Sequence, residues 1–176
     1  MNKKYVAIIA LVALFSGSTL NVAVADEQAP YGTAKENLHK YPKINRVYDV
    51  NYDDPKWLNA LVGFISNVNK VVPGKAVVVL HGTEIRAFAK ENYAKYQDVI
   101  DKLAALSKEG VDFRMCNNAM HGAGFKSEDI HGFVTIIPAG FAEVIDLQHK
   151  GYKVIDATAT KVKDSRYLDH PKEAKQ

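Results

Sequence analysis

The chain has 176 residues and one cysteine, with 47% hydrophobic and 24% charged residues and a formal net charge of +3. If an N-terminal leader carrying Lys3 and Lys4 is removed, the 23 basic residues become 21 against 20 acidic ones, a net charge of about +1. The basic residues are mixed with acidic ones, which is typical of solvated helix faces. The composition offers no basic surface for a polymer, and we expect no nucleic-acid partner.

Residues 1–25 have the organisation of a secretory signal peptide. Two lysines precede an apolar run at 5–15, and the Ala-Val-Ala sequence at 23–25 offers a small-x-small cleavage site before Asp26. The run is too short to span a membrane comfortably and no second one follows, so we expect no integral membrane segment after cleavage. An uncleaved N-terminal anchor is the alternative. The sequence predicts a periplasmic or secreted protein.

The remaining chain predicts one domain with polar ends. Residues 26–43 form a polar N-terminal arm, 44–156 carry the periodic apolar pattern, and 157–176 form a polar tail. Within the domain, segments of strand type alternate with helices, which predicts an α/β fold with a parallel sheet covered on both faces. The expected strands lie at 44–52, 76–80, 111–115, 133–137 and 152–155, and the expected helices begin near 53–55, 91 and 138–140.

Parallel strands bring their carboxyl ends to one edge of a sheet, where ligands bind in open α/β folds. Polar residues follow several expected strands in this sequence. We therefore expect a site at this edge, in which Asn117, Asn118, Gly82 and Gly140 bind a ligand. Asp53 and Asp54 also reach the edge, where either is expected to cap the first helix.

The candidate reactive group is the thiol of Cys116, at the end of the third expected strand. A thiolate needs a helix N-terminus or a cation beside it, so Asn117 or Asn118 is expected to cap a short helix there, and His81 to stabilise the thiolate or move its proton. The alternatives stay open. Cys116 can be buried and inert, as free cysteines often are, and His81 can simply cap its own strand.

Other chemistries have weaker support in the sequence. Cys116, Met120 and His121, with Met115 and His131 nearby, form a soft donor set that would favour copper, although their spacing fits no metal template. The glycines at 122 and 124 do not follow the strand-to-helix turn of a dinucleotide-binding loop, and no nucleophile elbow of a serine hydrolase is present. We therefore expect no cofactor.

The segment 44–155 resembles the DsrE/DsrF-like family in its exported single-domain branch. The resemblance is carried by the order and spacing of five motifs: Asp53-Asp54-Pro55 with Trp57, the Val-Val-Val-Leu-His-Gly sequence at 77–82, Cys-Asn-Asn-Ala-Met at 116–120, Ile-Pro-Ala-Gly at 137–140, and Leu-Gln-His-Lys-Gly-Tyr at 147–152. It implies a flavodoxin-like three-layer α/β/α sandwich with a mostly parallel five-stranded sheet, commonly assembled into trimers or hexamers. It also implies a cysteine that carries sulfur as a persulfide, and Cys116 matches that cysteine.

Three functional hypotheses follow. The first is sulfane sulfur handling through Cys116, as a persulfide carrier or sulfur relay with a protein that donates or accepts sulfur. The second is a module that binds a small ligand or copper in the strand-end crevice. The third is an oligomeric interaction protein in which Cys116 is structural.

Overall fold

The computed structural model describes residues 34–157. The described residues fall into two units, which divide between Leu38 and His39. Residues 34–38, the described part of the first unit, contain no helix or strand. The signal peptide expected at 1–25 and nearly all of the tail expected at 157–176 lie outside the described residues. All helices and strands within residues 34–157 belong to the second unit.

The second unit is built on a five-stranded sheet with the strand order β4-β3-β2-β1-β5. All neighbouring strands are parallel, which confirms the predicted fold class and makes the sheet parallel throughout. The chain moves one neighbour at a time from β1 to β4 and then crosses the sheet to place β5 beside β1. The strands are β1 (Arg46–Val50), β2 (Ala76–Leu80), β3 (Val111–Cys116), β4 (Val134–Ile137) and β5 (Lys153–Asp156).

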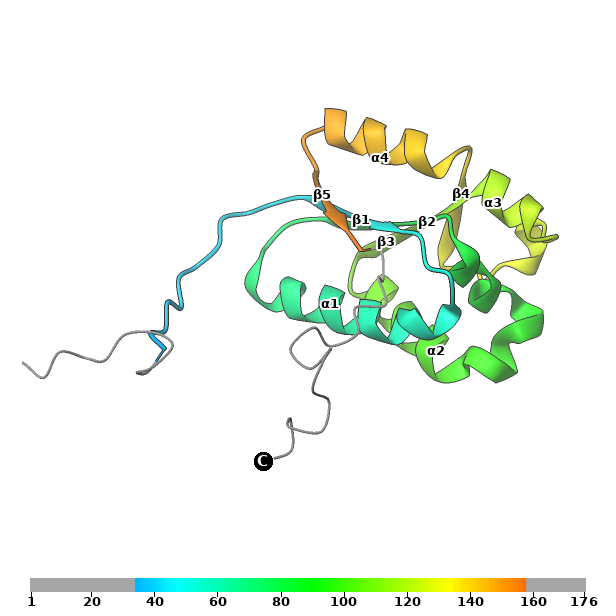
Figure 1. Ribbon diagram of the computed structural model, residues 1–176, viewed down its shortest axis with the longest axis horizontal. Coiled ribbons are helices and arrows are strands. Elements are labelled where there is room, and N and C mark those ends of the chain that lie inside the picture. Colours follow the sequence, from blue (N-terminus) through cyan, green and yellow to red (C-terminus); the bar gives the residue numbers. More distant parts are fainter. Residues whose placement is uncertain (1–33, 158–176) are drawn as a thin grey trace, which may run out of the picture. The chain divides into compact units, whose positions relative to one another are not determined.

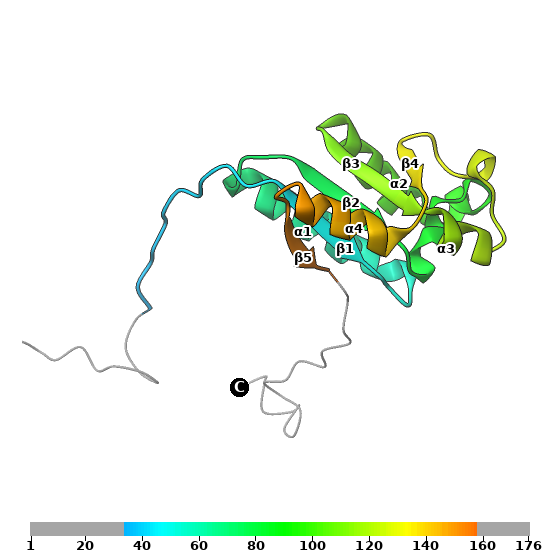
Figure 2. The same ribbon diagram turned by 90° about the horizontal axis from the view of Figure 1, so that it is seen from above.

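Helices cover both faces of the sheet, as predicted (Figure 1). α1 and α2 lie on one face and α4 on the other, where it contacts β1, β2, β3 and β5. Figure 2 shows α4 above the middle of the sheet. The α-helices are α1 (Leu58–Val71), α2 (Tyr93–Lys108), α3 (Asn117–Gly122) and α4 (Gly140–His149), and the short 3-10 helices are η1 (Pro55–Trp57), η2 (Thr83–Phe88), η3 (Lys90–Asn92) and η4 (Ser127–Asp129). No helix within residues 34–157 is long and apolar enough to cross a membrane.

The two faces of the sheet bury unequal cores. β2 supplies both of them, and all five of its residues are buried, as its unbroken apolar run predicts. The larger core lies under α1 and α2 and includes Tyr48, Leu61, Leu103 and Phe113, with Tyr93 and Tyr96 packed against it half-buried. The smaller core lies under α4 and consists of Val47, Val77, Val79, Val144 and Leu147.

Helix caps were predicted at two places, before the first helix and after Cys116. The Asp54 carboxylate accepts a hydrogen bond from the Lys56 N–H at 2.9 Å, which makes Asp54 the N-cap of η1, the 3-10 turn that leads into α1. The N-cap of α1 itself is Trp57, which makes no side-chain hydrogen bond there. The prediction that Asn117 or Asn118 caps α3 is wrong. β3 continues to Cys116, so α3 begins directly at Asn117, and its N-cap is Cys116 without a side-chain hydrogen bond.

The larger core makes a stability prediction. Leu103 of α2 is 0% exposed, whereas Ile145 of α4 is 66% exposed. Leu103→Ala should lower the free energy of unfolding by about 2–5 kcal/mol, because it removes buried methyl groups and leaves a cavity. Ile145→Ala should change it by no more than about 0.5 kcal/mol. Urea unfolding followed by circular dichroism measures both, and equal losses in the two variants would contradict this description of the core.

Candidate functional site

The carboxyl ends of the strands meet at one edge, where the predicted site residues gather. His81 directly follows β2, and its backbone N–H donates to the carbonyl of Val50 in β1 at 3.1 Å, so the ladder between the two strands continues through it. Leu80 is the register partner of Met115. Extending this register by one residue puts His81 and Cys116 at adjacent positions on the same face of the sheet.

His81 makes a short polar contact with Asp49 of β1. Its Nε2 lies 2.6 Å from Oδ1 of Asp49, and the His81 side chain is only 6% exposed. Because a carboxylate only accepts hydrogen bonds, Nε2 carries the hydrogen and Nδ1 keeps a lone pair. No side chain within residues 34–157 hydrogen-bonds to Nδ1. The pair therefore has the chemistry of a base oriented by an acid.

Asp49 was missed by the sequence analysis. It lies inside β1, and its neighbours Tyr48 and Val50 point to the opposite face into the larger core. A charged residue between the apolar side chains of Tyr48 and Val50 was the available signal. It could not be interpreted, because the sequence does not show which strand lies beside β1 on that face.

Residues at the start of α4 hold the imidazole in place. A Cβ atom on Gly140 would lie 2.9 Å from Cβ of His81, closer than side chains allow. The Phe141 ring packs on the His81 ring with 4.6 Å between centroids. Gly140 is thus positioned to let α4 approach His81, which is a packing role beside the ligand-binding role predicted for it.

Cys116 ends β3 and is only 6% exposed. Its thiol has no hydrogen-bond partner within the part of the chain that the structure describes. Asn117 is half-buried and Asn118 is exposed, both within α3. α3 has six residues, so the macrodipole behind the sulfur is small.

The nearest fixed cation on the same face of β3 is already neutralised. Arg114 donates to Asp112 at 2.6 and 2.9 Å and also pairs with Glu143 of α4. The carboxylates of Asp112 and Glu143 therefore balance the charge of the Arg114 guanidinium, which lies two residues before Cys116.

A buried carboxylate organises the two loops around the site. Glu84 is 0% exposed, and its oxygens accept hydrogen bonds from the N–H groups of Tyr52 at 2.8 Å and Gly82 at 2.9 Å. Gly82 has no room for a side chain, because a Cβ would lie 2.4 Å from Oε2 of Glu84 and 2.6 Å from the Tyr52 nitrogen. Burial raises the pKa of Glu84, and the hydrogen bonds from the Gly82 and Tyr52 N–H groups act against this rise. Glu84 was not among the predicted site residues either, because the sequence pattern did not indicate η2.

A cavity of about 490 Å³ opens beside these loops. The loops after β1 and β2 line it together with α3, and His81, Gly82 and Arg86 are among its wall residues. The predicted ligand residue Gly82 is therefore at the cavity. Cys116, Asn117, Asn118 and Gly140 are outside its lining.

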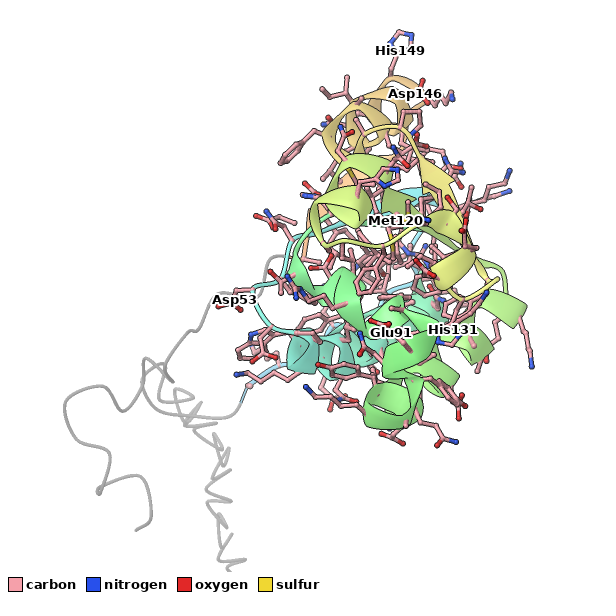
Figure 3. The ribbon with its side chains drawn as sticks, turned by 90° about the vertical axis from the view of Figure 1, so that its right-hand side faces the viewer. Asp53, Glu91, Met120, His131, Asp146 and His149 are labelled. Carbon is pink, nitrogen blue, oxygen red and sulfur yellow. The ribbon has the colours of Figure 1, made fainter. Side chains whose placement is uncertain are left out.

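The copper alternative gains no support from the geometry. Met120 is fully buried in the larger core, within the interior in Figure 3, and His121 is exposed. Within residues 34–157 no three His, Cys, Asp or Glu side chains are arranged to hold a metal ion. The three residues of the predicted donor set thus face different surroundings.

Comparison with known proteins agrees with the resemblance predicted from the sequence. Residues 20–157 match the model of the DsrE/DsrF-like family. No curated protein has a matching sequence. A solved structure of a protein of unknown function from Methanobacterium thermoautotrophicum is similar, with a TM-score of 0.54 and 18% identity over 67% of this chain and 99% of that chain. This likeness confirms the flavodoxin-like fold.

Glu84 makes a prediction for stability against pH. Its pKa is raised from 4.5 in the folded chain. The folded state therefore holds the proton more tightly than the unfolded state, and the contribution of Glu84 to stability falls as pH rises from 4.5 through the raised pKa. The Glu84→Gln variant does not titrate, so its unfolding free energy relative to wild type should rise across this range. Urea unfolding at several pH values measures the difference, and a difference that is constant with pH would contradict the prediction.

Proposed function

Because the chain belongs to the DsrE/DsrF-like family, we propose that it handles sulfane sulfur in a sulfur relay, with Cys116 as the atom that carries it. The observation that supports this proposal is the Asp49–His81 pair, which lies one strand away from Cys116 in register. A lone buried cysteine needs no such neighbour for packing. A cysteine that must become a thiolate does need one.

The chemistry requires a base and no external oxidant. Nδ1 of His81 takes the proton of Cys116, and Asp49 stabilises the imidazolium through Nε2. The thiolate attacks the outer sulfur of a donor persulfide R–S–SH, the donor S–S bond breaks, and its electron pair leaves with R–S⁻. The proton then passes from His81 to R–S⁻, which gives Cys116–S–SH and R–SH. Passing the sulfur to an acceptor thiolate is the reverse exchange.

The second hypothesis is supported by a different observation, the cavity of about 490 Å³ at the strand ends. Cys116 is outside its lining, so a module that only binds a ligand would not need the thiol. The third hypothesis is supported by the 6% exposure of Cys116, which suits a structural residue. These readings differ in what they predict for the thiol.

We further propose export and self-association. Export rests on residues 1–25 and makes the protein periplasmic or secreted. Assembly into a homotrimer or hexamer would bury apolar side chains that a single chain leaves in water. The large exposed ones in α1 are Phe64 and Val71.

Sulfur acceptance should be visible by mass. After incubation with inorganic polysulfide and removal of excess, the mature protein should gain about one sulfur atom that a reductant removes, and Cys116→Ser should gain none. His81→Ala should slow the gain about 100-fold, since a positioned base typically contributes at least this much. Intact-mass spectrometry over time measures the rates.

His149→Ala is the matched control, because His149 is exposed at the end of α4 and projects away from the sheet in Figure 3. It should gain sulfur at the wild-type rate. Cys116 would instead be a structural residue if the native wild-type protein took up no sulfur and resisted alkylation, and if the Cys116→Ser variant had a lower melting temperature. That result would end the sulfur-carrier proposal.

Processing makes a separate prediction. Cleavage after the Ala-Val-Ala sequence at 23–25 should leave Asp26 as the first residue of the exported protein. N-terminal sequencing of protein recovered from outside the cytoplasm tests it. Recovery with Met1 still present would favour the uncleaved anchor.

A further inference from the structure

The cavity beside His81 has unused polar groups in its wall. Arg86 has no side-chain hydrogen bond or ion pair with any residue of the described range 34–157, although its carbonyl accepts from Ala89 and Asn92. The side chains of Asn51 and Thr83 likewise have no hydrogen-bond partner within that range. A guanidinium is a planar fork whose N–H groups match a carboxylate in two places.

A negative charge at the cavity restricts the chemical class of the ligand further. Asp53 also lines it and stands at the outer side of the loop after β1 in Figure 3. Asp53 and Arg86 do not pair with each other. A simple anion would meet Arg86 but also the charge of Asp53. A group with both a carboxylate and an ammonium complements the two of them.

The size of the cavity favours an organic molecule over a small inorganic oxyanion. Its volume of about 490 Å³ falls within the range of about 300–1,000 Å³ that is usual for organic ligands. The wall along α3 is made of Ala119, Gly122 and Ala123, so no large side chain fills the space. A ligand of peptide size can enter beside α3.

The cavity also lies close to Cys116. His81 lines it and is the register neighbour of Cys116. Ala119 lines it as well, and it belongs to α3, the helix that begins directly after Cys116. A ligand held by Arg86 can thus direct a sulfur toward the thiol.

We propose that this cavity binds a low-molecular-weight thiol with an α-amino-acid group, with Arg86 on its carboxylate and Asp53 on its ammonium. This inference rests on the proposed function, because the persulfide of that thiol would be the R–S–SH that transfers its outer sulfur to Cys116 and leaves as R–SH. Cysteine and glutathione share this chemistry. It gives Arg86, Asp53 and Gly122 roles that the relay alone does not require.

The test uses S-methylglutathione, which has the amino-acid group and cannot transfer sulfur. Its binding to the mature full-length protein is measured by isothermal titration calorimetry, with S-methylcysteine and thiosulfate as comparison ligands. Wild type should bind one or both thioethers more tightly than thiosulfate. Arg86→Gln should weaken the binding at least about tenfold, because a charge-assisted pair is lost.

Control variants outside the cavity separate the effect of losing any positive charge, or of adding any large side chain, from an effect on the cavity itself. Lys108→Gln removes a positive charge at the end of α2, outside the cavity, and should bind as wild type does. Gly122→Leu should abolish binding by filling the cavity, and nothing lies within 4 Å of a Cβ added there, so the fold should tolerate it. Gly132→Leu is equally free of contacts and outside the cavity lining, and should bind normally.

The outcomes separate the two proposals. Absence of thioether binding, tighter binding of thiosulfate, equal weakening by Lys108→Gln, or normal binding by Gly122→Leu would each overturn the thiol site. If any of these occurs while Cys116 still gains sulfur from inorganic polysulfide, the proposed function stands without this site. If the thioethers bind as expected, in Cys116→Ser as well, but Cys116 never gains sulfur, the ligand site stands and the sulfur relay falls.

Discussion

The buried carboxylate of Glu84 is the interaction on which the site depends. It joins the loop after β1 to the loop after β2 by accepting from Tyr52 and Gly82, two N–H groups with which no strand pairs. Each such group would cost roughly 1–3 kcal/mol if buried without a partner. The same contact explains why Gly82 has no side chain and why His81 leaves β2 in a fixed direction. Glu84 therefore positions both the loops that line the cavity and the neighbouring residue His81.

The unequal cores explain why the reactive groups lie under α4. Two helices bury one face of the sheet in a large apolar core, whereas α4 alone covers the other with five core residues. Apolar packing there is confined to the middle of the sheet, so polar side chains can occupy the strand ends. Asp49, His81, Arg114 and Cys116 do so, with Glu143 and Phe141 of α4 above them. Because α4 is the only long helix on this face within the described residues, polar side chains can be accommodated beside it.

The sequence predicted the elements that local patterns determine. The unbroken apolar run of β2 and the helical spacing of apolar residues in α1 and α2 predicted these elements correctly. The positions of His81 and Cys116 directly at the strand ends predicted that both lie at the same edge of the sheet. Asp49 and Glu84 were missed because their roles come from contacts with β2 and with two loops, which no local pattern encodes. The cap of α3 was wrong by one residue for a related reason. Pairing with β4 extends β3 through Cys116, opposite Ile137.

The burial of Cys116 fits a carrier once its neighbours are considered. In the exported protein that we propose, the thiol would meet oxidants, and limited access would slow the disulfide exchange and oxidation that consume a thiol or its persulfide. Burial also makes a thiolate costly, so a buried reactive cysteine needs a proton acceptor that becomes a cation beside it. The Asp49–His81 pair has that property, and its own desolvation is a cost that apolar residues would avoid. The position of this pair beside a buried thiol is why we propose sulfur chemistry, and not packing alone, as the role of Cys116.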